Sequence, residues 1–93
     1  MHVYLMTNRP RGTLYIGVTN DLVRRVWEHR THAQSGFTDC YNLERLVHFE
    51  TFDGPSMAIQ REKSLKRWRR DWKIALVERE NPHWRDLWPG IAG

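Results

Sequence analysis

The strongest constraint on the fold is a pair of short stretches near the start of the chain that alternate apolar and polar side chains. Residues 2–7 read HVYLMT and residues 13–19 read TLYIGVT, with Pro10 and Gly12 between them. Alternation with a period of two and enrichment in β-branched and aromatic residues are typical of strands, whereas proline and glycine favour a turn. The sequence therefore predicts a β-hairpin with a longer loop.

The hairpin determines which side chains share a face, because successive residues of a strand point to opposite sides of a sheet. The aliphatic residues of both strands should form a core face, which leaves Tyr4 and Tyr15 together on the other face. Gly17 shares this second face, and a glycine inside a strand often marks the close approach of a ligand or of backbone. We therefore expect a hollow beside the two tyrosines.

The rest of the chain alternates helical and extended patterns. The predicted elements after the hairpin are a helix at 21–33, a strand at 43–52, helices at 56–68 and 70–80, and a tail at 81–93. Asn20 is a suitable N-cap for the first helix. On the last helix, one face is expected to carry Trp72, Ala75, Leu76 and Arg79. The order ββαβαα predicts an α+β fold, with a small three-stranded antiparallel or mixed sheet flanked by helices.

Length and composition favour a single domain. The chain has 93 residues, 40% of them hydrophobic and five of them Trp, which is enough for one compact core over residues 1–93, with the tail packed on it. No apolar run approaches the ~18 residues that a membrane span needs, so no membrane partner is expected. The first ten residues are too polar for a signal peptide. Cys40 is the only cysteine, which favours a cytoplasmic location.

Positive charge is concentrated in one segment of a chain whose formal net charge is +4. Residues 60–73, QREKSLKRWRRDWK, hold seven Lys and Arg against Glu62 and Asp71, a net of +5, so the remainder sums to −1. Cations interleaved with Trp68 and Trp72 are typical of a phosphate-binding surface. The candidate nucleic-acid-binding cations are Lys63, Lys66, Arg67, Arg69, Arg70 and Lys73. The alternative is a solvated helix face with both tryptophans in the core.

Three further side chains are candidates for the same site as the two tyrosines: the guanidinium of Arg25, the imidazole of His29 and the carboxylate of Glu62. Arg25 and His29 lie four residues apart on the first predicted helix, which leaves directly from the second strand, so both can reach back over the tyrosine face. Glu62 borders an apolar stripe on a later helix and needs a cation, either Lys66 or a metal ion. Each candidate also has a structural explanation: tyrosines at the rim of a core, an Arg25 ion pair with Asp21 or Glu28, a His29 helix cap, and a Glu62–Lys66 surface pair.

Several short motifs follow one another in a recognisable order. They are HVY ending at Tyr4, YIG at residues 15–17, DLVRRVWEHR with Arg25 and His29, AIQREKSLKRW with Glu62, and ENPHW with Asn81. From residue 3 to about 84 this order resembles the GIY-YIG endonuclease superfamily, in particular its small single-domain bacterial proteins. The chain reads HVY where the family reads GIY. His32 and Tyr41 both fit the further aromatic residue or histidine that the family often has after the first helix.

The resemblance implies hydrolysis of phosphodiester bonds in nucleic acid, most simply DNA in repair or recombination, with RNA or branched structures as other substrates. It implies one divalent ion, Mg²⁺ or Mn²⁺, held by Glu62, and a phosphate clamp at Arg25. Tyr4 is the first choice for the general base, and Tyr15 would position water or phosphate, although the sequence does not distinguish the two. His29 would form a hydrogen bond to the base or relay its proton.

Gly17 and Asn81 complete the predicted contacts with nucleic acid, although Asn81 precedes Pro82 and can equally serve only to end a helix. A second interpretation is a module on the same fold that binds nucleic acid without cutting it, or that cuts only with a targeting partner protein, because the chain leaves no room for a separate targeting domain. Exposure of Trp84 and Trp88 in the tail would support a homodimer.

Overall fold

The structure is a computed structural model that describes residues 1–32 and 42–92. Its elements, in chain order, are β1 (His2–Thr7), β2 (Leu14–Thr19), α1 (Leu22–Thr31), β3 (Arg45–Thr51), α3 (Pro55–Arg67), α4 (Arg70–Glu80) and α5 (Trp88–Ala92). The strands form one antiparallel sheet in the order β2-β1-β3. The predicted α+β fold is confirmed, and the short helix α5 in the tail is an addition to the predicted order.

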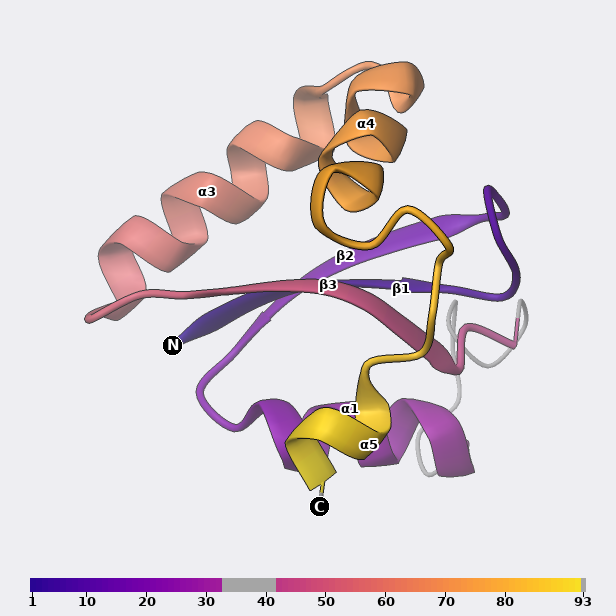
Figure 1. The fold of residues 1–93 in the computed structure, drawn as a ribbon. Coiled ribbons are helices and arrows are strands. Elements are labelled where there is room, and N and C mark those ends of the chain that lie inside the picture. Colours follow the sequence, from indigo (N-terminus) through magenta and orange to yellow (C-terminus); the bar gives the residue numbers. More distant parts are fainter. Residues whose placement is uncertain (33–41, 93) are drawn as a thin grey trace.

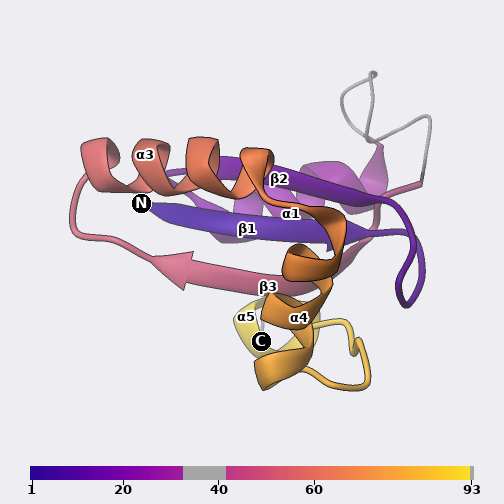
Figure 2. The same cartoon turned by 90° about the horizontal axis from the view of Figure 1, so that it is seen from above.

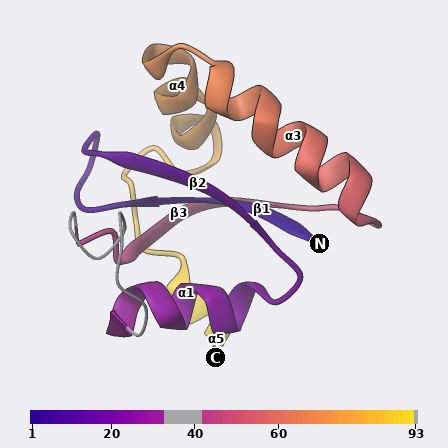
Figure 3. The same cartoon turned by 180° about the vertical axis from the view of Figure 1, so that it is seen from behind.

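Helices cover both faces of the sheet (Figure 1). On the face under α3 and α4, Val3, Leu5 and Ile16 pack in one core with Leu65 and Val77. On the face under α1 and α5, the core consists of Tyr4, Met6, Leu22, Val26, Leu43 and Leu46. The view from behind shows the same two helical layers with the sheet between them (Figure 3). The central strand β1 is therefore buried on both faces, as its run of buried residues from Val3 onward indicates.

The register of the hairpin places the two tyrosines on one face, as the alternation predicts. Tyr4 lies opposite Gly17, and Met6 lies opposite Tyr15, so all four side-chain positions share the face under α1. The expected hollow at Gly17 is filled by the Tyr4 ring. A Cβ atom at residue 17 would lie 2.5 Å from both Cζ and Oη of Tyr4. Glycine is needed here because the phenol occupies the space of a side chain.

The ends of α1 differ slightly from the prediction. Asp21, and not Asn20, is the N-cap: its side chain accepts a hydrogen bond from the backbone N–H of Arg24. The helix ends at Thr31, and His32 follows in the left-handed conformation with φ 55°. Among the described residues, no helix combines the length and the apolar character needed to cross a membrane.

The tail packs against both helical layers. Trp84 is only 2% exposed and belongs to the core under α3 and α4. The prediction that Trp84 is exposed, which was part of the support for a homodimer, is therefore wrong. Trp88 is half-buried beside the opposite core, where Arg30 lies over its ring. The side chain of Asn81 is buried and donates to the backbone carbonyls of Val47 and Arg85, which ties the tail to the sheet.

The strand order leaves β2 at one edge of the sheet. Seen from above, α3 runs along the sheet close to β2 (Figure 2), and it contacts both β2 and β1. The helix α1 follows β2 directly in the chain and returns beneath the other face. Side chains from both helical layers can therefore meet around the free edge of β2.

Candidate active site

Three predicted site residues form one buried hydrogen-bonded network. The Tyr4 hydroxyl lies 3.0 Å from Nε2 of His29, and Nε of Arg25 donates to the same hydroxyl at 3.3 Å. Tyr4 is only 1% exposed, and His29 is also buried. The hairpin register and the four-residue spacing on α1 bring these side chains together, as the sequence analysis predicted.

Burial shifts the pKa values of two groups in this network. Tyr4 Oη accepts from Nε of Arg25 and forms a second hydrogen bond with Nε2 of His29. Burial and the charge of Arg25 lower the pKa of His29 to about 4. Burial raises the pKa of Tyr4 to about 12, although Arg25 opposes this effect. At neutral pH the network therefore joins a neutral phenol and a neutral imidazole to one guanidinium.

Tyr15 also interacts with Tyr4 and Arg25 of this network and is closer to solvent. Its ring centroid is 6.2 Å from that of Tyr4 and 5.4 Å from that of His29. Unlike Tyr4, it is only partly buried. The four predicted residues therefore form one compact group, with Tyr15 on its outer side.

The guanidinium of Arg25 also borders a polar hollow. Its Nη1 atom donates to Glu28 at 3.2 Å, so the predicted ion pair between these residues is present. The hollow has a volume of about 480 Å³ and is lined by Thr19, Asn20, Asp21, Arg24, Arg25 and Glu28. A phosphate group entering it would meet the guanidinium from the solvent side, because Tyr4 holds that guanidinium from within.

The polar hollow includes residues that the sequence analysis did not assign to the site. Thr19, Asp21 and Arg24 line it beside Arg25. The run TNDLVRR from residue 19 to 25 contains all of them. Residues that lead from a strand into the first turn of a helix lie close together, so this run was the available signal.

Glu62 lies apart from the four residues on α1 and the hairpin. It belongs to α3, which covers the opposite face of the sheet. Its side chain is 16% exposed, and Nζ of Lys66 lies 3.3 Å from its carboxylate, as the surface-pair alternative predicts. In the part of the chain that the structure describes, no group of three or more His, Cys, Asp or Glu side chains could hold a metal ion.

A hollow at the edge of β2 connects the two helical layers. It has a volume of about 280 Å³ and is lined by Leu14, Tyr15, Ile16, Lys66 and Lys73. Tyr15 therefore meets cations of α3 and α4 here, and Lys66 in turn contacts Glu62. Lys66 is therefore a residue that contacts Glu62 and also lines the hollow with Tyr15.

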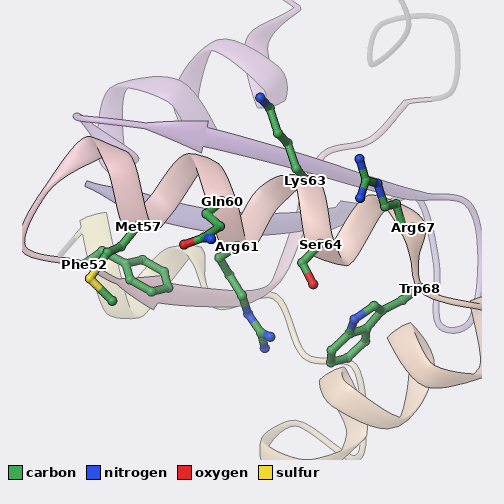
Figure 4. Close-up of a pocket in the computed structure, with 8 residues that line it drawn as sticks. All are labelled: Phe52, Met57, Gln60, Arg61, Lys63, Ser64, Arg67 and Trp68. Atoms are coloured by element: carbon green, nitrogen blue, oxygen red, sulfur yellow. The ribbon is translucent and has the colours of Figure 1, made fainter.

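The predicted basic patch is divided among several local environments. Lys66 and Lys73 line the hollow at β2, whereas Lys63 and Arg67 border a different one, on the exposed side of α3 (Figure 4). Arg70 donates to the backbone carbonyls of Arg11 and Gly12 and so fixes the hairpin loop. The basic residues of 60–73 therefore do not form one continuous patch but lie on separate parts of α3 and α4. Arg70 in addition has a structural role, because it binds the hairpin loop.

Trp68 and Trp72 take different positions on this surface. Trp68 is partly buried against the core under α3 and α4. Trp72 is 52% exposed, and α4 buries Leu76 and Val77 instead. The alternative with both tryptophans in the core is therefore wrong for Trp72, because α4 turns Leu76 and Val77 toward the core instead.

The other predicted positions have structural surroundings of their own. His32 forms a hydrogen bond with the carboxylate of Glu44, and Tyr41 lies outside the described residues. Gly17 is buried beneath the Tyr4 ring, and the amide of Asn81 is bonded to backbone. Contacts of Gly17 and Asn81 with nucleic acid stay predictions.

The fold and the site together define a small α+β domain whose tyrosines, arginine and histidine meet beside an edge strand. Residues 1–75 match the family model of the GIY-YIG catalytic domain. Because the match covers most of the chain, the protein belongs to the GIY-YIG family, a nuclease-type family that cleaves nucleic acid.

Similar proteins occur in archaea and bacteria. A UPF0213 protein of Haloquadratum walsbyi is 41% identical over 66 residues, which cover 71% of this chain and 74% of the relative. One from Halobacterium salinarum is 39% identical over 75 residues, covering 81% and 96%. One from Staphylococcus saprophyticus is 32% identical over 66 residues, covering 71% and 80%. The comparison with solved structures gives no match.

Proposed function

We propose that this protein is a metal-dependent endonuclease that hydrolyses phosphodiester bonds in DNA, in repair or recombination in the cytoplasm. The observation that carries the proposal is the network of Tyr4, His29 and Arg25 with Tyr15 at its outer side. Membership in a nuclease-type family supports it. Hydrolysis of a phosphodiester needs a base for water, cations for the phosphate oxygens and help for the leaving oxygen.

The burial of Tyr4 supports an exchange of the two tyrosine roles expected from the sequence. The Tyr4 hydroxyl is buried and bonded to Arg25 and His29, and burial raises its pKa to about 12. Tyr15 lines a hollow that opens to the surface, where an attacking water has access. We therefore assign the base to Tyr15, and we assign to Tyr4 and His29 the positioning of Arg25.

Arg25 is suited to clamp the substrate phosphate. Its guanidinium is planar and permanently charged, and it is fixed by Tyr4 on one side and Glu28 on another. It borders the polar hollow that a phosphate can enter. A preorganised cation of this kind stabilises charge that develops on phosphate oxygens without reorganising during the reaction.

Glu62 is the residue we assign to a divalent ion, Mg²⁺ or Mn²⁺. Members of the family typically use divalent metal ions. A single carboxylate fits Mg²⁺, which commonly binds one or two carboxylates, substrate phosphate and several waters. The carboxylate of Glu62 is paired with Lys66, which lines the hollow at the edge of β2. When bound, the ion would polarise the phosphate and stabilise the leaving oxygen.

Cleavage of labelled substrates tests the proposal. Single-stranded, duplex and branched DNA, and RNA, would be incubated with Mg²⁺, Mn²⁺ or EDTA. We expect metal-dependent cutting of DNA that is lost in Glu62→Gln and Tyr15→Phe. The matched control is Glu78→Gln, which removes another partly buried, ion-paired carboxylate, one that bonds Arg11 and Trp84. Equal cutting by Glu62→Gln and the wild type would contradict the metal assignment.

The position of Glu62 supports a second candidate function. Its carboxylate pairs with Lys66 on the other helical layer. A protein in which this pair persists would bind nucleic acid without cutting it, or would cut only when a targeting partner or second copy displaces Lys66. Salt-sensitive binding with no cutting in either metal would favour this candidate over the isolated nuclease.

A further inference from the structure

The exposed side of α3 carries a groove that the proposed chemistry does not use. It has a volume of about 660 Å³ and opens on the surface of the helix. Phe52 and Met57 lie at one end and Trp68 at the other, with Ser64 between them (Figure 4). This face of α3 lies on the helical layer opposite the Tyr4 network. The groove is therefore distinct from the candidate active site.

The long border of the groove is positively charged. Lys63 and Arg67 are one helical turn apart on α3, and both point to the side toward β2 (Figure 4). Within the described residues neither forms a salt bridge, whereas Arg61 is neutralised by a two-fold bond to Glu50. The charge that the groove presents to a ligand is therefore that of Lys63 and Arg67, which suits successive phosphates of a strand.

Aromatic rings occupy the end of the groove where α3 meets α4. Arg61 lies over the Trp68 ring at 5.0 Å and, being fixed by Glu50, holds that ring in place. Trp72 meets Trp68 edge to face, with ring centroids 6.1 Å apart. Trp72 is 52% exposed, an unusual position for so large an apolar side chain. We define Trp68 and Trp72 as the tryptophan corner.

We propose that this groove and the tryptophan corner bind unpaired nucleotides, with phosphates at Lys63 and Arg67 and a base stacked on the tryptophans. Aromatic rings beside a cationic groove are the general means of holding single strands, because every base has a face to stack. The inference rests on the proposed function in one respect: the bound strand continues to the active site. Its substrate class is then single-stranded nucleic acid, or a duplex with a single-stranded end.

The path between the two sites favours a flexible strand. From the tryptophan corner it passes Lys66 and Lys73 at the edge of β2, reaches Tyr15, and turns beneath the sheet to Arg25. The whole domain measures only 28 × 27 × 27 Å. Duplex DNA has a persistence length of about 150 base pairs, so a turn this tight costs a duplex bending energy that a flexible single strand does not require.

Binding in EDTA tests the inference without any need for cleavage. Fluorescence anisotropy would compare a labelled 15-nucleotide strand, a strand of equal length without bases, and a duplex. We expect the wild type to bind the strand with bases most tightly. Trp72→Ala should weaken that binding roughly ten-fold and leave binding of the base-free strand unchanged. Trp72→Phe should restore part of the loss, since it keeps a ring that can stack.

The chain offers a matched control in Trp27 on α1, which is 51% exposed against 52% for Trp72. Trp27→Ala should bind like the wild type. Equal affinity for strands with and without bases, or an unchanged affinity of Trp72→Ala, would overturn the inference. Equally tight binding of poly-glutamate would also overturn it and indicate an acidic protein partner. Base-dependent binding by a protein that cuts nothing would support the inference and count only against the proposed function.

Discussion

The two faces of the sheet use polar side chains in opposite ways. Under α1, Tyr4 and His29 are buried and joined to Arg25 by hydrogen bonds. On the other layer, the core cluster is apolar, and the polar contact of buried His48 with Glu50 lies beside it and is paired with Arg61. The cations Lys63 and Arg67 lie on the outer side of α3. A buried network fixes geometry and is costly to interrupt, whereas exposed charges act on ligands at little cost in stability. One face sets the position of reacting groups, and the other supplies attraction for the substrate.

The largest effect that would sharpen this contrast is the pH dependence of stability. His29 has a pKa of about 4 in the folded protein against an ordinary value of 6.5. Between these values the unfolded chain binds a proton that the folded protein excludes. The free energy of unfolding should therefore fall by about 3 kcal/mol as the pH is lowered through this window. Urea denaturation from pH 7 to 4 measures it, and His29→Gln should remove this component. If the unfolding free energy of His29→Gln depends on pH as steeply as that of the wild type, groups other than His29 cause the dependence.

The next largest effect is expected from the Tyr4 hydroxyl. Tyr4→Phe leaves Nε2 of His29 and Nε of Arg25 without this buried partner, which should cost about 2 kcal/mol of unfolding free energy. Tyr15→Phe removes a hydroxyl from a partly exposed ring and should cost less, about 0.5 kcal/mol. Thermal or urea denaturation of both variants gives the comparison. Equal losses would mean that burial does not distinguish the two tyrosines.

Glu62 is expected to separate stability from activity. Its ion pair with Lys66 is partly exposed, and pairs of this kind contribute about 0.5 kcal/mol. Glu62→Gln should therefore unfold at nearly the same urea concentration as the wild type while losing cleavage. A large loss of stability would place Glu62 in the core of the fold and remove the contrast between the two faces.

The smallest effect on stability is expected at the outer side of α3. Lys63→Ala and Arg67→Ala should change the unfolding free energy by less than about 0.5 kcal/mol. Each should also lower the slope of binding affinity against salt concentration by about 1. Titrations of a labelled strand at several salt concentrations measure that slope. An unchanged slope would show that these cations do not contact phosphate.

The sequence predicts the tyrosine face because the period of a strand leaves no choice. Once the hairpin exists, Tyr4, Tyr15 and Gly17 must share a side. Arg25 and His29 follow because α1 leaves directly from β2 and their spacing matches a helical turn. These inferences use only local geometry, and the structure agrees with them.

Features that depend on packing between elements could not be predicted in the same way. The burial of Tyr4 depends on how α1 lies against the sheet, and no alternation pattern contains that distance. The exposure of Trp72 and the burial of Trp84 depend on how α4 and the tail pack, and the sequence alone does not fix either position. The location of Glu62 on the opposite layer likewise depends on where α3 crosses the sheet.

Position 17 shows how a site can depend on an atom that is missing. A methyl group there would meet the Tyr4 ring, and Tyr4 in turn holds Arg25 and His29. In a library of all substitutions, residue 17 would behave like a member of the site although it carries no functional group. The size of the side chain at position 17 therefore offers a way to shift the guanidinium of Arg25 indirectly, through the Tyr4 phenol.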